Sequence, residues 1–127
     1  MSKSFYLGAA LATVLLSAMP ASAQTALGSY VARLSDNDHY ASDGYKLDTA
    51  AQVVRQDRAN WHRFGRGDPE DEDDPWFTSN SKRAEFEKLL NKSGAISQSA
   101  RRAIMGGEPL VRVTVYRNSV KVEIVGN

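Results

Sequence analysis

The side chains that could carry chemistry in this chain of 127 residues are concentrated between positions 55 and 77. The first half of this segment is rich in arginine. Its second half has six carboxylates in the seven positions from Asp68 to Asp74. Trp61 and Trp76 flank the change in charge. Neighbouring carboxylates repel one another, so they need water, a cation or the nearby arginines around them. Three interpretations of the segment are open.

The first interpretation is a solvated acidic loop whose charge the preceding arginines partly balance. Exposed ion pairs contribute little to stability, so replacing Asp73 and Asp74 by Asn should leave the fold intact. The second interpretation is a surface that recognises a partner, because tryptophan and arginine are enriched among the residues that dominate binding energy. That binding surface is predicted to comprise Arg58, Trp61, His62, Arg63, Arg66, Trp76 and Phe77.

The third interpretation is a calcium site that stabilises a structural protein. Carboxylate oxygens are the ligands that calcium prefers, and a short acidic loop can supply six or more of them. The EF-hand pattern is not met, because no glycine stands at the sixth loop position and two prolines stiffen the run. The predicted ligands are Asp68, Glu70, Asp71, Asp73 and Asp74.

Groups suited to catalysis are few. His39 and His62 are the only histidines, and the chain has no cysteine. Motifs of serine hydrolases, of phosphate-binding loops and of histidine metal sites are absent. Asp57 and His62 are five positions apart, roughly 140° around a helix, so they should not form a catalytic pair. We therefore expect a binding function with no catalytic residue and no cofactor other than calcium. A small hydrolase, or an inhibitor of an enzyme, is a further alternative.

The first 23 residues read as a cleavable Sec signal peptide. Lys3 supplies the positive end, and Phe5 to Met19 is an uncharged apolar run. A helix of that length spans about 22 Å, short of the ~30 Å hydrocarbon core of a membrane. Pro20 then ends the run, and the A-x-A sequence at residues 21–23 suits signal peptidase. The pattern predicts a bacterial protein of the periplasm or the extracellular space, with no membrane span after cleavage.

The net charge of the exported chain limits the classes of partner. Cleavage removes Lys3 and leaves 15 basic and 15 acidic side chains. A nearly neutral protein has no bulk attraction for nucleic acid or for anionic membranes. The predicted partner is therefore another periplasmic or envelope protein.

The elements that must position the segment form a small α+β domain over residues 49–127, after a polar, turn-rich stretch at 24–48. Apolar spacing and capping residues predict helices at about 49–64, 81–91 and 98–105. Asp57 falls on or beside the core-facing stripe of the first helix. A buried carboxylate is costly unless it is paired, so Arg58, Arg33 or a backbone amide should bind it.

A β-hairpin is predicted at about 110–125, because two runs of alternating valines flank a short polar turn. A turn at 118–119 sets Val115 opposite Val122, whereas a turn at 117–118 sets Arg112 opposite Glu123; both registers keep valine opposite valine or isoleucine. Two strands alone are marginally stable. The three helices should therefore pack on the hairpin, and a short strand at residues 30–34 is a candidate third strand. The predicted core is Val53, Val54, Trp61, Phe64, Phe86, Leu89, Leu90, Ile104, Val111, Val113, Val122 and Ile124.

Overall fold

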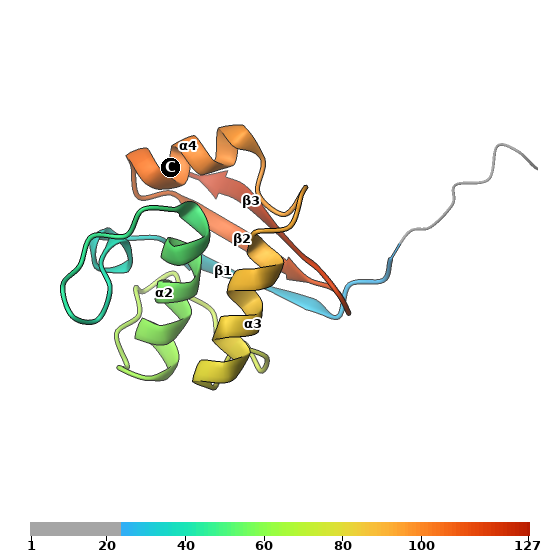
Figure 1. Cartoon of the computed structure of the whole chain (residues 1–127), viewed down its shortest axis with the longest axis horizontal. Helices are drawn as coiled ribbons and strands as arrows, with labels where there is room; N and C mark the ends of the chain where they lie inside the picture. Colours follow the sequence, from blue (N-terminus) through green and yellow to red (C-terminus); the bar gives the residue numbers. More distant parts are fainter. Residues whose placement is uncertain (1–23) are drawn as a thin grey trace, which may run out of the picture.

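The computed structural model describes residues 24–127, so the predicted signal peptide lies outside the described residues. The α+β prediction is confirmed, including the third strand near the N-terminus (Figure 1). The elements in chain order are β1 (Gly28–Arg33), the 3₁₀ helix η2 (Asp36–His39), α2 (Ala50–His62), α3 (Asn80–Leu90), α4 (Gln98–Gly106), β2 (Leu110–Val115) and β3 (Val120–Gly126).

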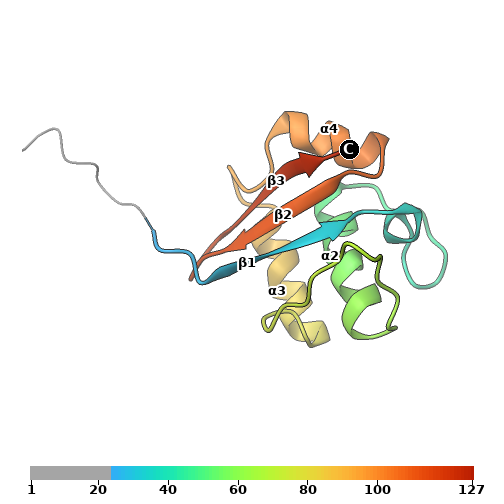
Figure 2. The same ribbon diagram turned by 180° about the vertical axis from the view of Figure 1, so that it is seen from behind.

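The three strands form one antiparallel sheet in the order β1-β2-β3. All three α-helices lie on the same face of this sheet, and Figure 2 shows the opposite face free of helices. Tyr30 of β1 stands opposite Val113 of β2, and both side chains are buried against the helices. The sheet thus supplies one wall of the core, and the helices supply the other.

The hairpin takes the second of the two predicted registers. Arg112 is opposite Glu123 and Val113 is opposite Val122, so the turn residues are Arg117 and Asn118. The Tyr116 amide donates to the Ser119 carbonyl at 2.9 Å and closes this turn. The register keeps the valines on the buried face and the charged side chains on the other, as period-two alternation requires.

The helices begin where their capping residues predict. Thr49, Ser79 and Ser97 each accept a backbone hydrogen bond from the first turn of α2, α3 and α4 respectively. Such side chains satisfy amides that have no partner within the helix. Within residues 24–127, no helix combines the length and the apolar character needed to cross a membrane.

Eight of the twelve predicted core side chains are buried, and the core also contains Tyr30, Leu34, Phe77 and Ile96, which the prediction omitted. Leu89, Ile124 and Trp61 are half-buried, and Phe64 is exposed at 36%. The predicted helix runs to residue 64, but α2 ends at His62 and the chain turns at Gly65, whose φ of +62° favours glycine. Phe64 therefore lies beyond the helix, and its ring is exposed instead of facing the core.

Candidate functional site

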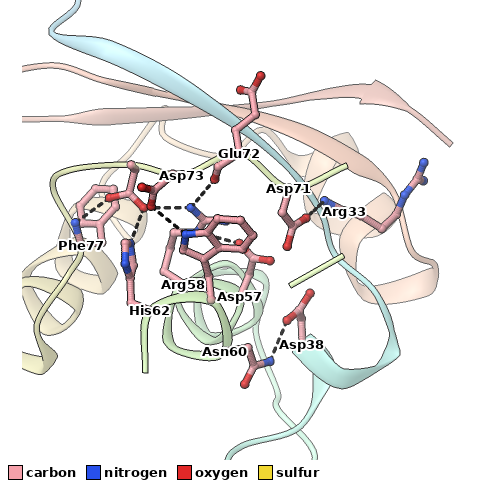
Figure 3. A network of polar contacts seen from close by, with 12 residues as sticks. Arg33, Asp38, Asp57, Arg58, Asn60, His62, Asp71, Glu72, Asp73 and Phe77 are labelled. Atoms are coloured by element: carbon pink, nitrogen blue, oxygen red, sulfur yellow. Dashed lines mark hydrogen bonds and ion pairs between the residues drawn. The ribbon is translucent and has the colours of Figure 1, made fainter. Parts of the chain in front are cut away.

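A buried arginine lies beneath the charged segment. Arg58 of α2 has an exposed fraction of 0% and its Nε donates to Asp57 Oδ2 at 2.8 Å. Its Nη1 donates to Asp74 Oδ1 and to the Glu72 carbonyl, each at 2.9 Å (Figure 3). The guanidinium also lies over the Tyr30 ring, 4.0 Å from the centroid. Charge-assisted bonds of this kind offset the large cost of removing a guanidinium from water.

Asp74 joins Arg58 to the chain that follows the carboxylates. Its Oδ1 also accepts from His62 Nε2 at 2.7 Å, and its Oδ2 accepts from the amides of Trp76 and Phe77 at 2.9 and 2.7 Å. Burial favours the neutral acid. The bonds from the Phe77 amide, Arg58 and His62 nevertheless outweigh burial and hold the pKa of Asp74 below its usual value. Asp74 is therefore the ionised partner of the buried arginine.

Asp57 pairs with Arg58, one of the partners expected from the sequence. Burial raises the pKa of Asp57 well above its usual value, although the charge of Arg58 opposes that shift. The expected separation of Asp57 from His62 also holds, because His62 bonds Asp74 instead.

Residues 68–74, which we call the acidic segment, lie along the free edge of β1. The Val31 amide donates to Glu72 Oε1, and the Glu72 amide donates to the Val31 carbonyl, both at 2.8 Å. The next outward-facing amide, that of Arg33, donates to Asp71 Oδ1 at 2.8 Å (Figure 3). Carboxylates and one backbone group thus bind the strand edge where a fourth strand would otherwise pair.

Side-chain contacts continue this docking. Glu70 forms a two-pronged ion pair with the Arg33 guanidinium, and Ser35 Oγ donates to Asp68 Oδ2 at 2.8 Å. The solvated-loop interpretation holds only in part, because Glu70, Glu72 and Asp73 are exposed but Asp68 and Asp71 are half-buried and Asp74 is buried. Glu70, Asp71 and Glu72 are bound by β1 and Asp68 by Ser35 after it, whereas Asp74 is paired with Arg58 of α2.

The five predicted calcium ligands do not converge on one point. Four of them are directed at separate protein donors, and Asp73 Oδ1 accepts from Trp61 Nε1 at 2.8 Å. Within residues 24–127, the one group of three potential ligands close enough to share an ion is His62, Asp73 and Asp74. Arg58 donates to Asp74 Oδ1, the oxygen that also bonds His62, and the positive charge of Arg58 would repel a cation at this position.

The structure divides the seven predicted surface residues into three sets. Arg58 and Phe77 are buried and cannot contact a partner. The half-buried side chains are Trp61, His62 and Trp76, and the exposed ones are Arg63 and Arg66.

The two tryptophans pack against glycines of the chain. A Cβ on Gly67 would lie 2.3 Å from the Trp61 ring, and one on Gly28 would lie 2.7 Å from the Trp76 ring. Contacts this close require glycine at both positions. Trp61 therefore packs against the chain just before the acidic segment, and Trp76, just after it, packs against β1.

Sequence reasoning missed Phe64, which it placed in the core. The ring is exposed and has two guanidinium groups near it, with Arg63 Cζ at 5.0 Å and Arg66 Cζ at 5.8 Å from its centroid. Both distances fall within the range of a cation–π contact. Gly65, directly after Phe64, is the sequence signal that the helix has ended before the ring.

A second missed residue is Arg83 of α3, which is 4% exposed. Its Nη1 donates to the Phe77 carbonyl at 2.9 Å. In the sequence, Arg83 shares a helical stripe with Phe86 and Leu90, three and seven positions later, and both of these are buried. An arginine on an apolar stripe is the signal that could have identified it.

Neither histidine belongs to a recognisable catalytic arrangement among the described residues. Both ring nitrogens of His39 lie within 2.9 Å of backbone carbonyl oxygens, those of Ser35 and Ile104. His62 is held by Asp74 as described above. No family model matches the chain, and no curated protein or solved structure matches it either. A function for this chain is therefore inferred from its sequence and from the geometry of the site.

The Arg58–Asp74 pair generates a stability prediction. Asp74→Asn should lower the free energy of unfolding by about 3–5 kcal/mol, because it leaves a buried guanidinium without its countercharge. Urea denaturation would measure the loss. The matched control is Asp73→Asn, which changes the exposed neighbouring carboxylate and should shift the urea midpoint little. Similar effects of the two substitutions would contradict the role assigned to Asp74.

Asp38 generates a pH prediction. Its carboxylate is buried and accepts from Asn60 Nδ2 at 2.8 Å and from the Ser35 amide at 3.1 Å. Burial outweighs these bonds and raises the pKa of Asp38 to about 6. A carboxyl whose pKa is higher in the folded state stabilises the fold fully below its unfolded pKa of about 3.9. That stabilisation is lost as the pH rises through about 6.

Lowering the pH from 7 to 5 should therefore increase the free energy of unfolding of the parent protein by roughly 1 kcal/mol more than that of Asp38→Asn. The comparison cancels contributions from other titrating groups, and urea denaturation at each pH measures it. Asp36→Asn, an exposed change in the same 3₁₀ helix, should keep the pH dependence of the parent. A dependence unchanged in Asp38→Asn would refute the assignment.

Proposed function

We propose that this chain is a small exported protein that binds another protein of the periplasm or envelope and catalyses no reaction. The signal-like N-terminus supports the compartment. The site geometry supports binding over catalysis, because the charged groups near α2 are engaged in holding the segment together. The exposed groups that remain beside them are arginines and an aromatic ring.

The observation that carries the proposal is Phe64 between Arg63 and Arg66 at the end of α2. Aromatic and arginine side chains dominate the binding energy of many protein interfaces. An exposed ring close to two guanidinium groups offers apolar area and hydrogen-bond donors at one place. We call Arg63, Phe64 and Arg66 the Phe64 surface.

Packed and hydrogen-bonded residues of α2 hold the Phe64 surface in place, and this also supports a binding role. Arg58 lies one helical turn before His62 and is fixed on both sides by carboxylates. The Trp61 ring packs against Gly67, which directly follows Arg66. A surface that is already ordered loses less conformational entropy when it binds.

Export generates the first test. Protein recovered from its native cells should begin at Gln24, because signal peptidase cleaves after the A-x-A sequence. Intact-mass spectrometry of the soluble fraction would measure this N-terminus. Recovery of a chain that begins at Met1 in the membrane fraction would refute export by a cleaved signal.

The Phe64 surface generates the second test. The chain from Gln24 onward would be immobilised and exposed to periplasmic extract, and bound proteins would be quantified by mass spectrometry. Phe64→Ala should reduce recovery of the specific partner at least about tenfold, the loss typical of a central aromatic at an interface. Leu27→Ala removes an exposed apolar side chain outside the segment and should leave recovery unchanged. A partner retained equally by both variants would place the binding site elsewhere.

A further inference from the structure

Three arginines line one hollow beside the Phe64 surface. The hollow has a volume of about 400 Å³ and lies between α2, α3 and the loop at residues 41–47. Arg55 and Arg63 approach it from the α2 side, and Arg83 approaches it from α3. The two helices run side by side in both views of the fold (Figures 1 and 2). We call this hollow the arginine groove.

The positive charge of the arginine groove is incompletely balanced, because its three arginines outnumber the two carboxylates that line it, Asp43 and Glu87. Arg55 pairs with Glu87 at 3.0 Å and also donates to Asn80 Oδ1 at 3.2 Å. Among residues 24–127, neither Arg63 nor Arg83 has a carboxylate within ion-pair distance. Two of the three guanidinium groups therefore form no ion pair with a described residue.

Arg83 is the least expected of the three, because a nearly buried cation normally has a paired carboxylate. Within the described residues, the one hydrogen bond that its guanidinium donates goes to a neutral carbonyl, that of Phe77. Burial lowers the pKa of Arg83, and the charges of Arg55 and Arg63 lower it further. An anion in the arginine groove would remove this repulsion and would accept from the guanidinium donors that have no protein partner.

The start of α3 adds to the positive potential. Asn80, its first residue, lines the arginine groove, and the helix dipole places partial positive charge at this end. The exposed Phe64 ring lines the same hollow. The arginine groove thus combines a small excess of cationic donors with apolar side chains, among them Phe64 and Leu47.

We propose that the arginine groove binds an oxyanion, carboxylate or phosphoryl, whose adjoining apolar part packs on Phe64. Guanidinium groups match both kinds of anion with paired N–H donors. This inference rests on the proposed function, since the groove adjoins the Phe64 surface, and it identifies the chemistry that the partner presents. Arg63 is the exposed guanidinium shared by the groove and that surface.

The test is isothermal titration of the chain from Gln24 onward with sodium citrate and, separately, with sodium phosphate. Sodium chloride keeps the ionic strength constant in both arms. Saturable binding of at least one anion is expected, and the tighter of the two identifies the carboxylate or the phosphoryl class. Arg63→Gln should weaken that binding about tenfold, because it removes a charged donor. Absence of saturable binding in both arms would overturn the inference.

The matched control is Arg112→Gln, because Arg112 is an exposed arginine of β2 that belongs neither to the arginine groove nor to the Phe64 surface. It should retain affinity within about twofold, as expected for an exposed charge outside the site. Equal losses in the two variants would indicate general surface charge and would also overturn the inference. Both changes are at exposed side chains, so folding is preserved. Loss of partner capture in Phe64→Ala, with no anion binding by the parent protein, would refute the groove alone and leave the proposed function standing.

Discussion

The buried ion pair between Arg58 and Asp74 links helix α2 to the acidic segment. Arg58 belongs to α2, and Asp74 closes the acidic segment that runs beside β1. Because Asp74 also accepts from the Phe77 amide, it sets the position of the Phe77 ring, which stacks on Phe86 of α3 at 3.8 Å. One carboxylate therefore couples α2, the acidic segment and the core face of α3. Arg83 of the arginine groove donates to the Phe77 carbonyl and so joins the same network.

Burying these charged groups costs free energy. The number of hydrogen bonds that each carboxylate accepts decides whether burial raises its pKa. Asp74 accepts four hydrogen bonds and its pKa is lowered, whereas Asp57 accepts one and its pKa is raised. Within the described residues, Tyr30 Oη, Asp57 Oδ1 and Arg58 Nη2 are buried without a partner. Unpaired buried polar atoms typically cost about 1–3 kcal/mol each. The surrounding hydrophobic core must offset this cost.

The sequence predicted the features that depend on contacts between residues close together in the chain. The capping serines and threonine set the helix starts, and the alternation of valines narrowed the hairpin to two registers, one of which is present. The Arg58–Asp74 pair spans sixteen positions and depends on the path of the chain, so no periodicity reveals it. Phe64 was misplaced because its helical spacing fits the α2 stripe, although the helix ends two residues earlier. To predict the docking of the acidic segment, two features have to be combined. One is the run of carboxylates, and the other is an edge strand whose outward-facing amides have no neighbouring strand.

The docked acids also explain how a nearly neutral chain produces a local excess of positive charge. Asp68, Glu70, Asp71 and Glu72 are drawn to the β1 side by its amides, by Arg33 and by Ser35. They are then unavailable to the arginines on the α2–α3 side, where Glu87 is the carboxylate that forms an ion pair. Net charge therefore says little about the potential at the arginine groove, because the fold separates charges that are close together in the sequence. The same backbone amides that protect the edge of the sheet leave Arg63 and Arg83 open to an external anion.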